Sequence, residues 1–158
     1  MRVYFMSDLH LEMGPLNIAL PTPQNRDTDV LVLAGDICSL HQLDPRNSSI
    51  EAVSHRAVMK AFKEQVERLF SLVVIVGGNH DIYGSLIDNG TLLLRQHFPN
   101  AIILENDAIE INGLRFIGAT LWSSFHNADP DSARACSEGM SDFSTIRKIG
   151  ADHTDLGA

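Results

Sequence analysis

Short apolar runs alternate with polar loops along the first half of the chain. Residues 3–6, 30–34 and 72–76 consist almost entirely of apolar side chains, and each run stops abruptly at polar residues. Runs of this kind are typical of strands buried on both faces of a parallel sheet. Apolar residues also recur at helical spacing within residues 50–70 and 85–97. The order strand, helix, strand predicts adjacent parallel strands joined by right-handed crossovers.

Polar residues indicate where the helices begin. Ser48 with Glu51, and Ser85 with Asp88, have the spacing of a capping box, so we expect the two helices to open there. Asp129-Pro130 has the form of an N-cap followed by proline in the first turn, which predicts a further short helix.

The later part of the chain changes to an antiparallel pattern. Residues 102–104 are typical of another short strand, and Asn112-Gly113 separates apolar runs, the second over residues 114–119. An Asn-Gly pair in this setting is the strongest short-range signal of a β-hairpin. Residues 14–29 hold three of the six prolines and are expected to form a surface loop. The pattern as a whole predicts an α/β protein.

Composition limits the classes of function. The chain has 158 residues and a formal charge of −8, which disfavours binding to nucleic acid or to an anionic membrane. No apolar run is long enough to span a bilayer, and the N-terminus turns polar too soon for a signal peptide. Cys38 and Cys136 have neither disulfide-scaffold nor zinc-ribbon spacing. We therefore expect a cytoplasmic globular protein.

Residues able to bind metal or move protons follow each of the three predicted strands. Asp8 and His10 come after the first, Asp36 after the second, and residues 79–81 (Asn-His-Asp) after the third. Each group alone is common in turns and loop caps. Because ligands gather at the carboxyl ends of strands in α/β sheets, the repetition favours one shared site. Carboxylate, imidazole and amide groups suit a divalent metal ion.

With these motifs the sequence resembles the calcineurin-like metallophosphoesterase superfamily. Further segments resemble a bacterial and phage subgroup of it, namely residues 7–12, 29–37, 83–84, 116–122 and 140–143. The resemblance implies an α/β/β/α sandwich, of which this chain would form roughly the N-terminal two-thirds. It also implies hydrolysis of phosphate mono- or diesters by a metal-bound hydroxide at a dinuclear site, with a phosphorylated small molecule or other phosphoester as substrate.

The resemblance also implies a role for each residue. Asp8 and His10 would hold the first metal, Asp36 would bridge the two metals, and Asn79 would bind the second. His80 matches a histidine that is not a ligand and that stabilises or protonates the leaving group. The expected ions are Mn²⁺, with Fe, Zn²⁺ and Mg²⁺ as alternatives. Three aspartates, Asp8, Asp36 and Asp81, are expected to form a negative mouth that only bound metal makes attractive to phosphate.

Two departures from the superfamily pattern affect these expectations. Ser39 stands where its protein phosphatases have an aspartate that pairs with the catalytic histidine, so His80 must be oriented otherwise. The superfamily also has a further histidine after a later strand and then a Gly-His-x-His loop, and this sequence has no histidine in a matching context for either. We therefore expect residues 1–158 to be one C-terminally incomplete domain that binds at most one ion tightly. An exposed sheet edge would favour self-association.

Two alternatives to an active metallophosphoesterase remain at this stage. In the first, the chain is a non-catalytic fragment that acts at most as a binding or structural module. In the second, it is a serine esterase of the SGNH type. The second needs a serine after Gly-Asp, where this chain has Ile37. Trp122 and Phe125 could line a pocket, but core packing is the expected role. The remaining histidines are expected at the surface or in local hydrogen bonds, and they are His41, His55, His97, His126 and His153.

Overall fold

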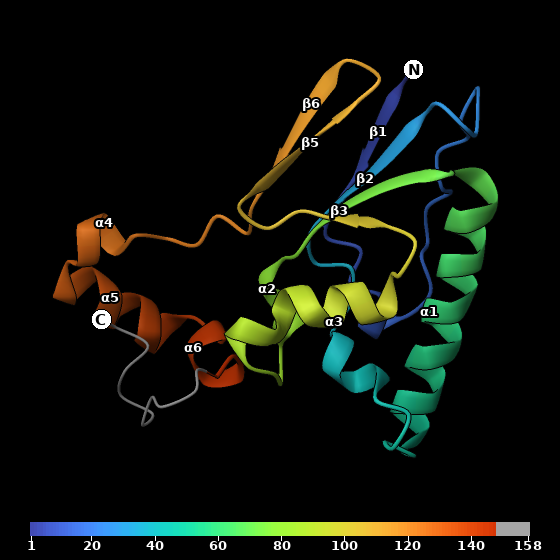
Figure 1. The fold of residues 1–158 in the computed structure, drawn as a ribbon. Coiled ribbons are helices and arrows are strands. Elements are labelled where there is room, and N and C mark those ends of the chain that lie inside the picture. The colour runs from blue at the N-terminus through green and yellow to red at the C-terminus, as the bar shows by residue number, and fades with distance from the viewer. Residues whose placement is uncertain (148–158) are drawn as a thin grey trace.

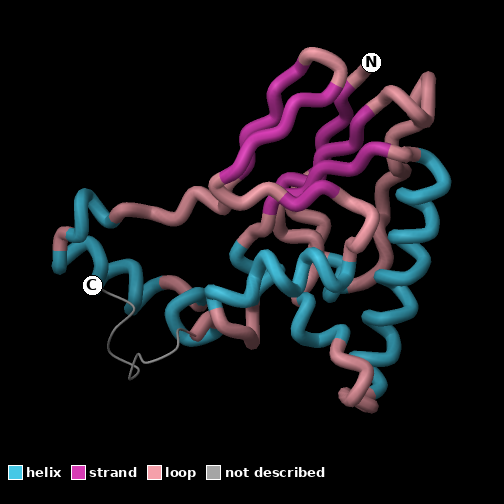
Figure 2. Tube along the Cα trace, in the orientation of Figure 1, coloured by secondary structure: helices cyan, strands magenta, loops and turns pink. Residues whose placement is uncertain are grey.

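Four parallel strands form the central sheet of the structure, a computed structural model that describes residues 1–147. They lie in the order β1 (Val3–Met6), β2 (Val30–Ala34), β3 (Leu72–Val76) and β4 (Ile102–Ile103), as Figures 1 and 2 show. The predicted adjacent parallel strands are thus confirmed. The expectation of burial on both faces is wrong for β1, because this strand pairs only with β2 and leaves Phe5 71% exposed.

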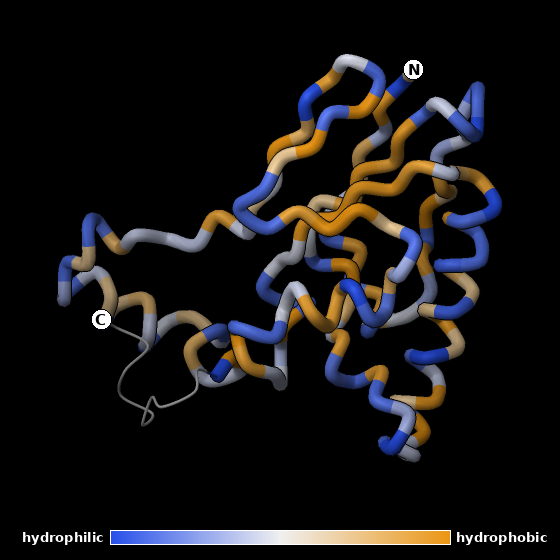
Figure 3. Tube along the Cα trace, in the orientation of Figure 1, coloured by the Kyte–Doolittle hydropathy of each residue, from blue (hydrophilic) through white to orange (hydrophobic). Residues whose placement is uncertain are grey.

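One face of the sheet is covered by helices. The long α1 (Ile50–Leu69) buries Met59, Phe62 and Val66 in a core shared with β2 and β3. The Ser49 hydroxyl accepts from the Ala52 N–H at 3.1 Å, so the helix begins one residue later than the sequence predicted. The shorter α3 (Gly90–His97) follows the same face, and Figure 3 shows the hydrophobic sheet that both helices cover.

The start of α3 also differs from the prediction. A 3₁₀ turn, η3 (Ile87–Asn89), precedes the helix, and residue 85 lies outside it. The reason is a distant contact: Leu86 forms a parallel bridge with Arg147, and the Ile87 N–H donates to the Arg147 carbonyl at 2.8 Å. The Ser85 carbonyl also accepts from the Arg147 N–H at 3.0 Å, and a helix capped at residue 85 would need this carbonyl for its first intrahelical bond. Shorter helical segments are η1 (Leu11–Met13), η2 (Leu40–Leu43) and α2 (Asn79–Ile82).

The predicted hairpin covers the other face of the sheet. It consists of β5 (Asp107–Ile111) and β6 (Leu114–Gly118), joined by Asn112-Gly113 with positive φ at both residues. Ile111 and Phe116 pack in a second core against Val30, Val32 and Val74. Helices, parallel sheet and hairpin form successive layers, and the predicted α/β class is confirmed.

The chain after the hairpin forms α4 (Phe125–Ala128), α5 (Pro130–Gly139) and α6 (Asp142–Thr145), which project beyond the sheet (Figure 1). Asp129 caps α5 by accepting from the Ser132 N–H at 2.8 Å, as predicted. The chain then returns to the loop after α2, where the Gly84 N–H donates to the Thr145 carbonyl. Within residues 1–147 both cysteines are free thiols, and no helix there is long and apolar enough to cross a bilayer.

Candidate metal centre

The loops after β1 and β2 are paired with each other. The Asp8 N–H donates to the Gly35 carbonyl at 3.1 Å, and the His10 N–H donates to the Asp36 carbonyl at 3.0 Å. These bonds extend the parallel pairing of the strands into the loops. Because of this pairing, Asp8, His10 and Asp36 meet at the carboxyl edge of the sheet, as the sequence predicted.

The same three residues have strained backbones. Their φ angles are +53° at Asp8, +44° at His10 and +52° at Asp36, all in the left-handed region. Each such residue costs about 1–2 kcal/mol unless it is glycine. Strain of this kind persists where the surrounding structure enforces it, and it is concentrated at functional sites.

The side chains of Asp8, His10 and Asp36 form a cluster with the chemistry of a metal site. One ligand atom from each lies within 4.8 Å of the others. Asp36 Oδ1 accepts from the His80 N–H at 2.9 Å, while Oδ2 lies 4.0 Å from His10 Nε2. The donors are two carboxylates and an imidazole, so these residues fit a divalent ion of the Mn²⁺, Fe, Zn²⁺ or Mg²⁺ kind.

The loop after β3 approaches this cluster through glycine. A Cβ at Gly78 would lie 2.5 Å from the Asp36 backbone nitrogen, and a Cβ at Gly35 would lie 3.1 Å from Gly78 Cα. Side chains at these positions would push the loops apart. The two glycines therefore allow Asn79 and His80 to reach the aspartates.

Asn79 is oriented by its neighbours. Its Nδ2 donates to Asp142 Oδ1 at 2.6 Å and to the Tyr83 hydroxyl at 3.3 Å. The Tyr83 hydroxyl also donates to the same Asp142 oxygen at 2.9 Å. Because the amide nitrogen is engaged on this side, the carbonyl Oδ1 of Asn79 is left as the atom that can bind a cation. Sequence reasoning did not single out Asp142 as a site residue.

A carboxylate that sequence reasoning missed, Glu12, connects the two site histidines. Its Oε1 accepts from His10 Nδ1 at 3.2 Å and from His80 Nδ1 at 3.1 Å. Burial opposes ionisation, but hydrogen bonds from its own N–H and from both rings hold the pKa of Glu12 below its ordinary value. The signal in the sequence was a glutamate two residues after His10, which η1 turns back toward the ring.

Glu12 also accounts for how His80 is held although Ser39 replaces the usual aspartate. The Ser39 hydroxyl donates to the Tyr83 carbonyl at 3.3 Å instead. The His80 ring lies between two others, with its centroid 4.4 Å from that of His10 and 4.1 Å from that of Tyr83. Glu12 and these two rings fix the orientation that the sequence left open.

Asp81 does not line the site, which corrects the expected negative mouth. It is fully buried, and its carboxylate accepts four backbone N–H bonds, from Asp36, Ile37, Cys38 and Gly78. Burial raises the pKa of Asp81 to about 6, although N–H donors including that of Gly78 favour the ionised form. Asp81 therefore joins the loops after β2 and β3 through buried hydrogen bonds. The carboxylates at the candidate metal site are those of Asp8 and Asp36.

The other histidines lie apart from this cluster. His41 and His126 are exposed, whereas His55 and His97 are partly buried. Burial, with a contribution from nearby Lys63, lowers the pKa of His97. His153 lies outside the described residues.

Trp122 does not pack in the core, which corrects another expectation. It is 47% exposed, and with Ser123, Met140 and Asp142 it lines a cleft that also contains Asn79. Phe125 is partly buried beside Phe143, with ring centroids 5.8 Å apart, and lines a cavity next to that cleft. Both aromatic residues therefore lie on surfaces that adjoin the candidate site.

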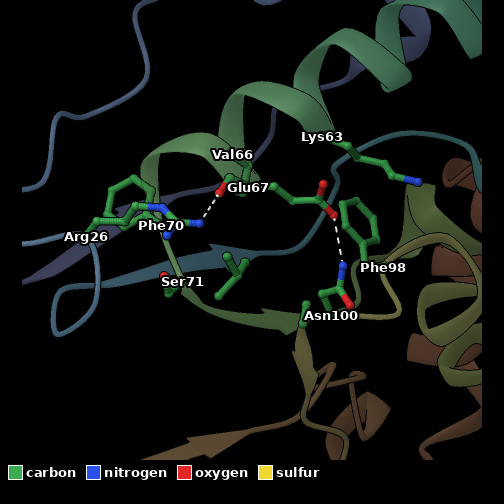
Figure 4. Close-up of a pocket in the computed structure, with 10 residues that line it drawn as sticks. Arg26, Lys63, Val66, Glu67, Phe70, Ser71, Phe98 and Asn100 are labelled. Atoms are coloured by element: carbon green, nitrogen blue, oxygen red, sulfur yellow. Dashed lines mark hydrogen bonds between the residues drawn. The ribbon is translucent and has the colours of Figure 1, made fainter.

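A separate cavity of about 350 Å³ lies at the opposite end of the sheet, beside the start of β3 (Figure 4). Its cationic Arg26 is already engaged, because Nε donates to the Arg68 carbonyl and Nη2 to the Glu67 carbonyl. The Glu67 carboxylate accepts from Asn100 at 3.2 Å. Since Arg26 caps the end of α1 and no candidate ligand lines this cavity, we assign it no part in the metal centre.

Comparison with known proteins agrees with this geometry. The family described as calcineurin-like phosphoesterase matches residues 1–143. A protein of Acanthamoeba polyphaga mimivirus, called uncharacterized protein L509, is 29% identical over 161 residues, which cover 92% of this chain and 51% of the viral protein.

A similar fold occurs in a crystal structure of phosphopantetheinyl hydrolase from Mycobacterium tuberculosis. The TM-score is 0.59 at 14% identity, over 95% of this chain and 56% of that one. The chain thus spans about half the length of both proteins.

Proposed function

The chain belongs to the calcineurin-like phosphoesterase family, and we propose that it hydrolyses phosphate mono- or diesters at a dinuclear metal site. The observation that carries the proposal is the cluster of Asp8, His10 and Asp36, whose ligand atoms lie within 4.8 Å of one another. The loop after β3 adds Asn79 and His80 at the same edge. Residues 1–158 would then act as one metallophosphoesterase domain, equivalent to about half of its longer relatives.

Each side chain has an assigned part in this proposal. Asp8 and His10 would hold the first ion, Asp36 would bridge, and the carbonyl oxygen of Asn79 would face the second ion. The ions would be Mn²⁺, with Fe, Zn²⁺ and Mg²⁺ as alternatives. When bound, such ions would supply positive charge for the phosphoryl oxygens and lower the pKa of a water molecule, which provides a hydroxide to attack phosphorus.

His80 would protonate the leaving group. Its Nδ1 faces Glu12, so Nδ1 carries the hydrogen that is donated there, and Nε2 is the atom left to give a proton to the departing oxygen. His10 is held by the same carboxylate in the same way, which leaves its Nε2 as the ligand atom facing Asp36. One glutamate would thereby fix the tautomer of the ligand His10 and the orientation of the acid His80, which needs a proton on both nitrogens to give one from Nε2.

A non-catalytic role remains the second candidate, because the chain spans only about half of the proteins that it matches. In that case the candidate metal site would bind a phosphoester or stabilise the fold without hydrolysing a substrate.

The deciding experiment is hydrolysis of 4-nitrophenyl phosphate by the purified chain, with EDTA and with added Mn²⁺. We expect turnover only with metal. Asp36→Asn should abolish turnover and lower the metal content, because it removes the bridging charge. Asp131→Asn is the matched control, since this aspartate is 89% exposed on α5. Metal-independent turnover, or full activity of Asp36→Asn, would refute the proposal.

A further inference from the structure

An apolar cavity of about 340 Å³ lies beside the candidate metal centre, among the segment after β6, α5, α6 and the turn at η3. Its apolar lining is made by Ile87, Trp122, Phe125, Met140, Phe143 and Ile146. Three of these are aromatic, and the Trp122 ring is about half exposed. The volume is within the range of small-molecule sites, about 300–1,000 Å³, at its lower end.

The cavity adjoins the cleft that contains Asn79. The cleft over Asn79 and the apolar cavity share four lining residues, Trp122, Ser123, Met140 and Asp142. Asp142 stands between them, and its Oδ1 accepts from Asn79 Nδ2 and from the Tyr83 hydroxyl. A phosphoryl group beside Asn79 would therefore have its substituents next to the apolar walls.

The charge of the cavity limits what can enter it. Within the part of the chain that the structure describes, no lysine, arginine or histidine lines this cavity, and Asp142 is its one ionisable carboxylate. A second anionic group would meet the Asp142 carboxylate, and none of the described residues that line the cavity would offset that charge. An uncharged apolar group, a flat ring above all, would lie against aromatic side chains.

We propose that this cavity binds an uncharged apolar group, of the size of an aromatic ring, carried by the phosphoester substrate. The inference rests on the proposed function for the position of the phosphoryl group, and it narrows the substrate class to phosphoesters with an apolar substituent. It disfavours substrates whose other substituent carries further phosphates.

Binding is tested without turnover through Trp122, which is the single tryptophan of the chain. Phenylphosphonate, titrated into the Mn²⁺-loaded protein, should change the Trp122 fluorescence at concentrations at least about tenfold lower than methylphosphonate, since a buried ring is worth more than one methyl group. Equal responses to the two phosphonates, or none, would overturn the proposal. If the chain dimerises and the Trp122 fluorescence of the dimer does not change with phenylphosphonate, the proposal is overturned as well.

Selectivity in turnover is tested with 4-nitrophenyl phenylphosphonate and 4-nitrophenyl methylphosphonate. In each, water adds to phosphorus, the bond to the same 4-nitrophenolate breaks, and a phosphonic acid remains. The ratio of the two kcat/KM values should fall at least about tenfold in Met140→Ala and Phe143→Ala. Leu92→Ala, on α3 and 55% exposed, is the matched control and should keep the wild-type ratio.

A filling variant covers the case in which the alanine variants fail to fold. Cys136 lines the same cavity and is partly buried, so Cys136→Phe should place a ring inside it and lower the ratio as well. If the wild type hydrolyses neither ester nor 4-nitrophenyl phosphate, the proposed function fails while the fluorescence titration still decides the cavity. If it hydrolyses 4-nitrophenyl phosphate alone, the proposed function stands and the titration decides the cavity. If it hydrolyses both with a ratio that none of these variants changes, the cavity proposal fails and the proposed function stands.

Discussion

At the scale of single residues, Oε1 of Glu12 connects the two histidines of the candidate site. It accepts hydrogen bonds from two imidazole rings, while the Oε2 of the same carboxylate is buried and finds no hydrogen-bond partner among residues 1–147. A buried carboxylate oxygen in this state is costly, so the arrangement persists because it holds His10 and His80 in place. The orientation of a proposed ligand and of a proposed acid therefore depends on a single carboxylate that bonds to both rings.

This dependence predicts different effects for two substitutions. Glu12→Gln should lower kcat by about 10- to 100-fold and weaken metal binding, since a neutral amide oxygen holds the two rings less strongly than a carboxylate does. His80→Gln should lower kcat by about 10²-fold or more with nearly unchanged metal content, because it removes only the acid. Steady-state kinetics and metal analysis of both variants decide this, with Glu110→Gln on the exposed side of β5 as control. Loss of metal from the His80 variant would mean that His80 is a ligand.

At the scale of elements, the sequence predicted what depends on local pattern. The bounds of β1, β2 and β3, the turn at Asn112-Gly113 and the cap at Asp129 follow from apolar runs and turn residues close in the chain. What could not be predicted depends on partners far away. The bridge of Leu86 to Arg147 delays α3, and the four N–H groups around Asp81 come from two loops.

The site divides in the same way. Asp8, His10, Asp36 and Asn79 could be placed at one edge because they follow strands that the apolar pattern revealed. The parts of Glu12 and Asp142 could not be predicted, since they depend on how η1 folds back and on where α6 lies against α2.

Asp81 is expected to stabilise the fold and not to bind metal. Asp81→Ala would leave four backbone N–H groups without their acceptor, at a cost of at least about 3 kcal/mol. Thermal and urea unfolding in EDTA should show the full loss, while Asp88→Ala, at an exposed position in η3, should show little. A loss that appears only with metal present would instead make Asp81 a ligand.

The position of the α1 cap gives a second test at this scale. Ser49→Ala should destabilise the protein by about 1 kcal/mol, because the Ala52 N–H loses its acceptor. Ser48→Ala is the matched control one residue away, and unfolding experiments should show almost no effect. Equal losses, or a larger loss at Ser48, would contradict the cap seen in the structure.

At the scale of the whole molecule, apolar surface lies open on the sheet and the hairpin. Phe5 on β1 is 71% exposed, Ile117 on β6 is 76% exposed, and Leu121 just after it is 91% exposed. Scattered exposed residues are ordinary, but β1 is also an edge strand, which among the described residues pairs on one side only. We propose that the self-association expected from the sequence uses this edge.

The number of bound ions is a property of the whole chain. Within the described residues, the proposed first position would have three charged or imidazole ligands, Asp8, His10 and Asp36, whose ligand atoms lie close together. The proposed second position would share Asp36 and add the neutral carbonyl oxygen of Asn79. Affinity depends on ligand number and charge, so the two positions should differ widely.

We therefore expect one tightly held divalent ion per chain. Metal analysis after dialysis against buffer with Mn²⁺ and then without it should give about one ion, because three ligands are enough to retain it and two are not. Asp8→Asn should lose that ion, whereas Asn79→Ala should keep it. Two retained ions per chain would mean that a further ligand completes the second position, either His126, His153 or a histidine of a neighbouring copy. Repeating the analysis on the monomeric fraction would then separate a ligand within the chain from one supplied by self-association.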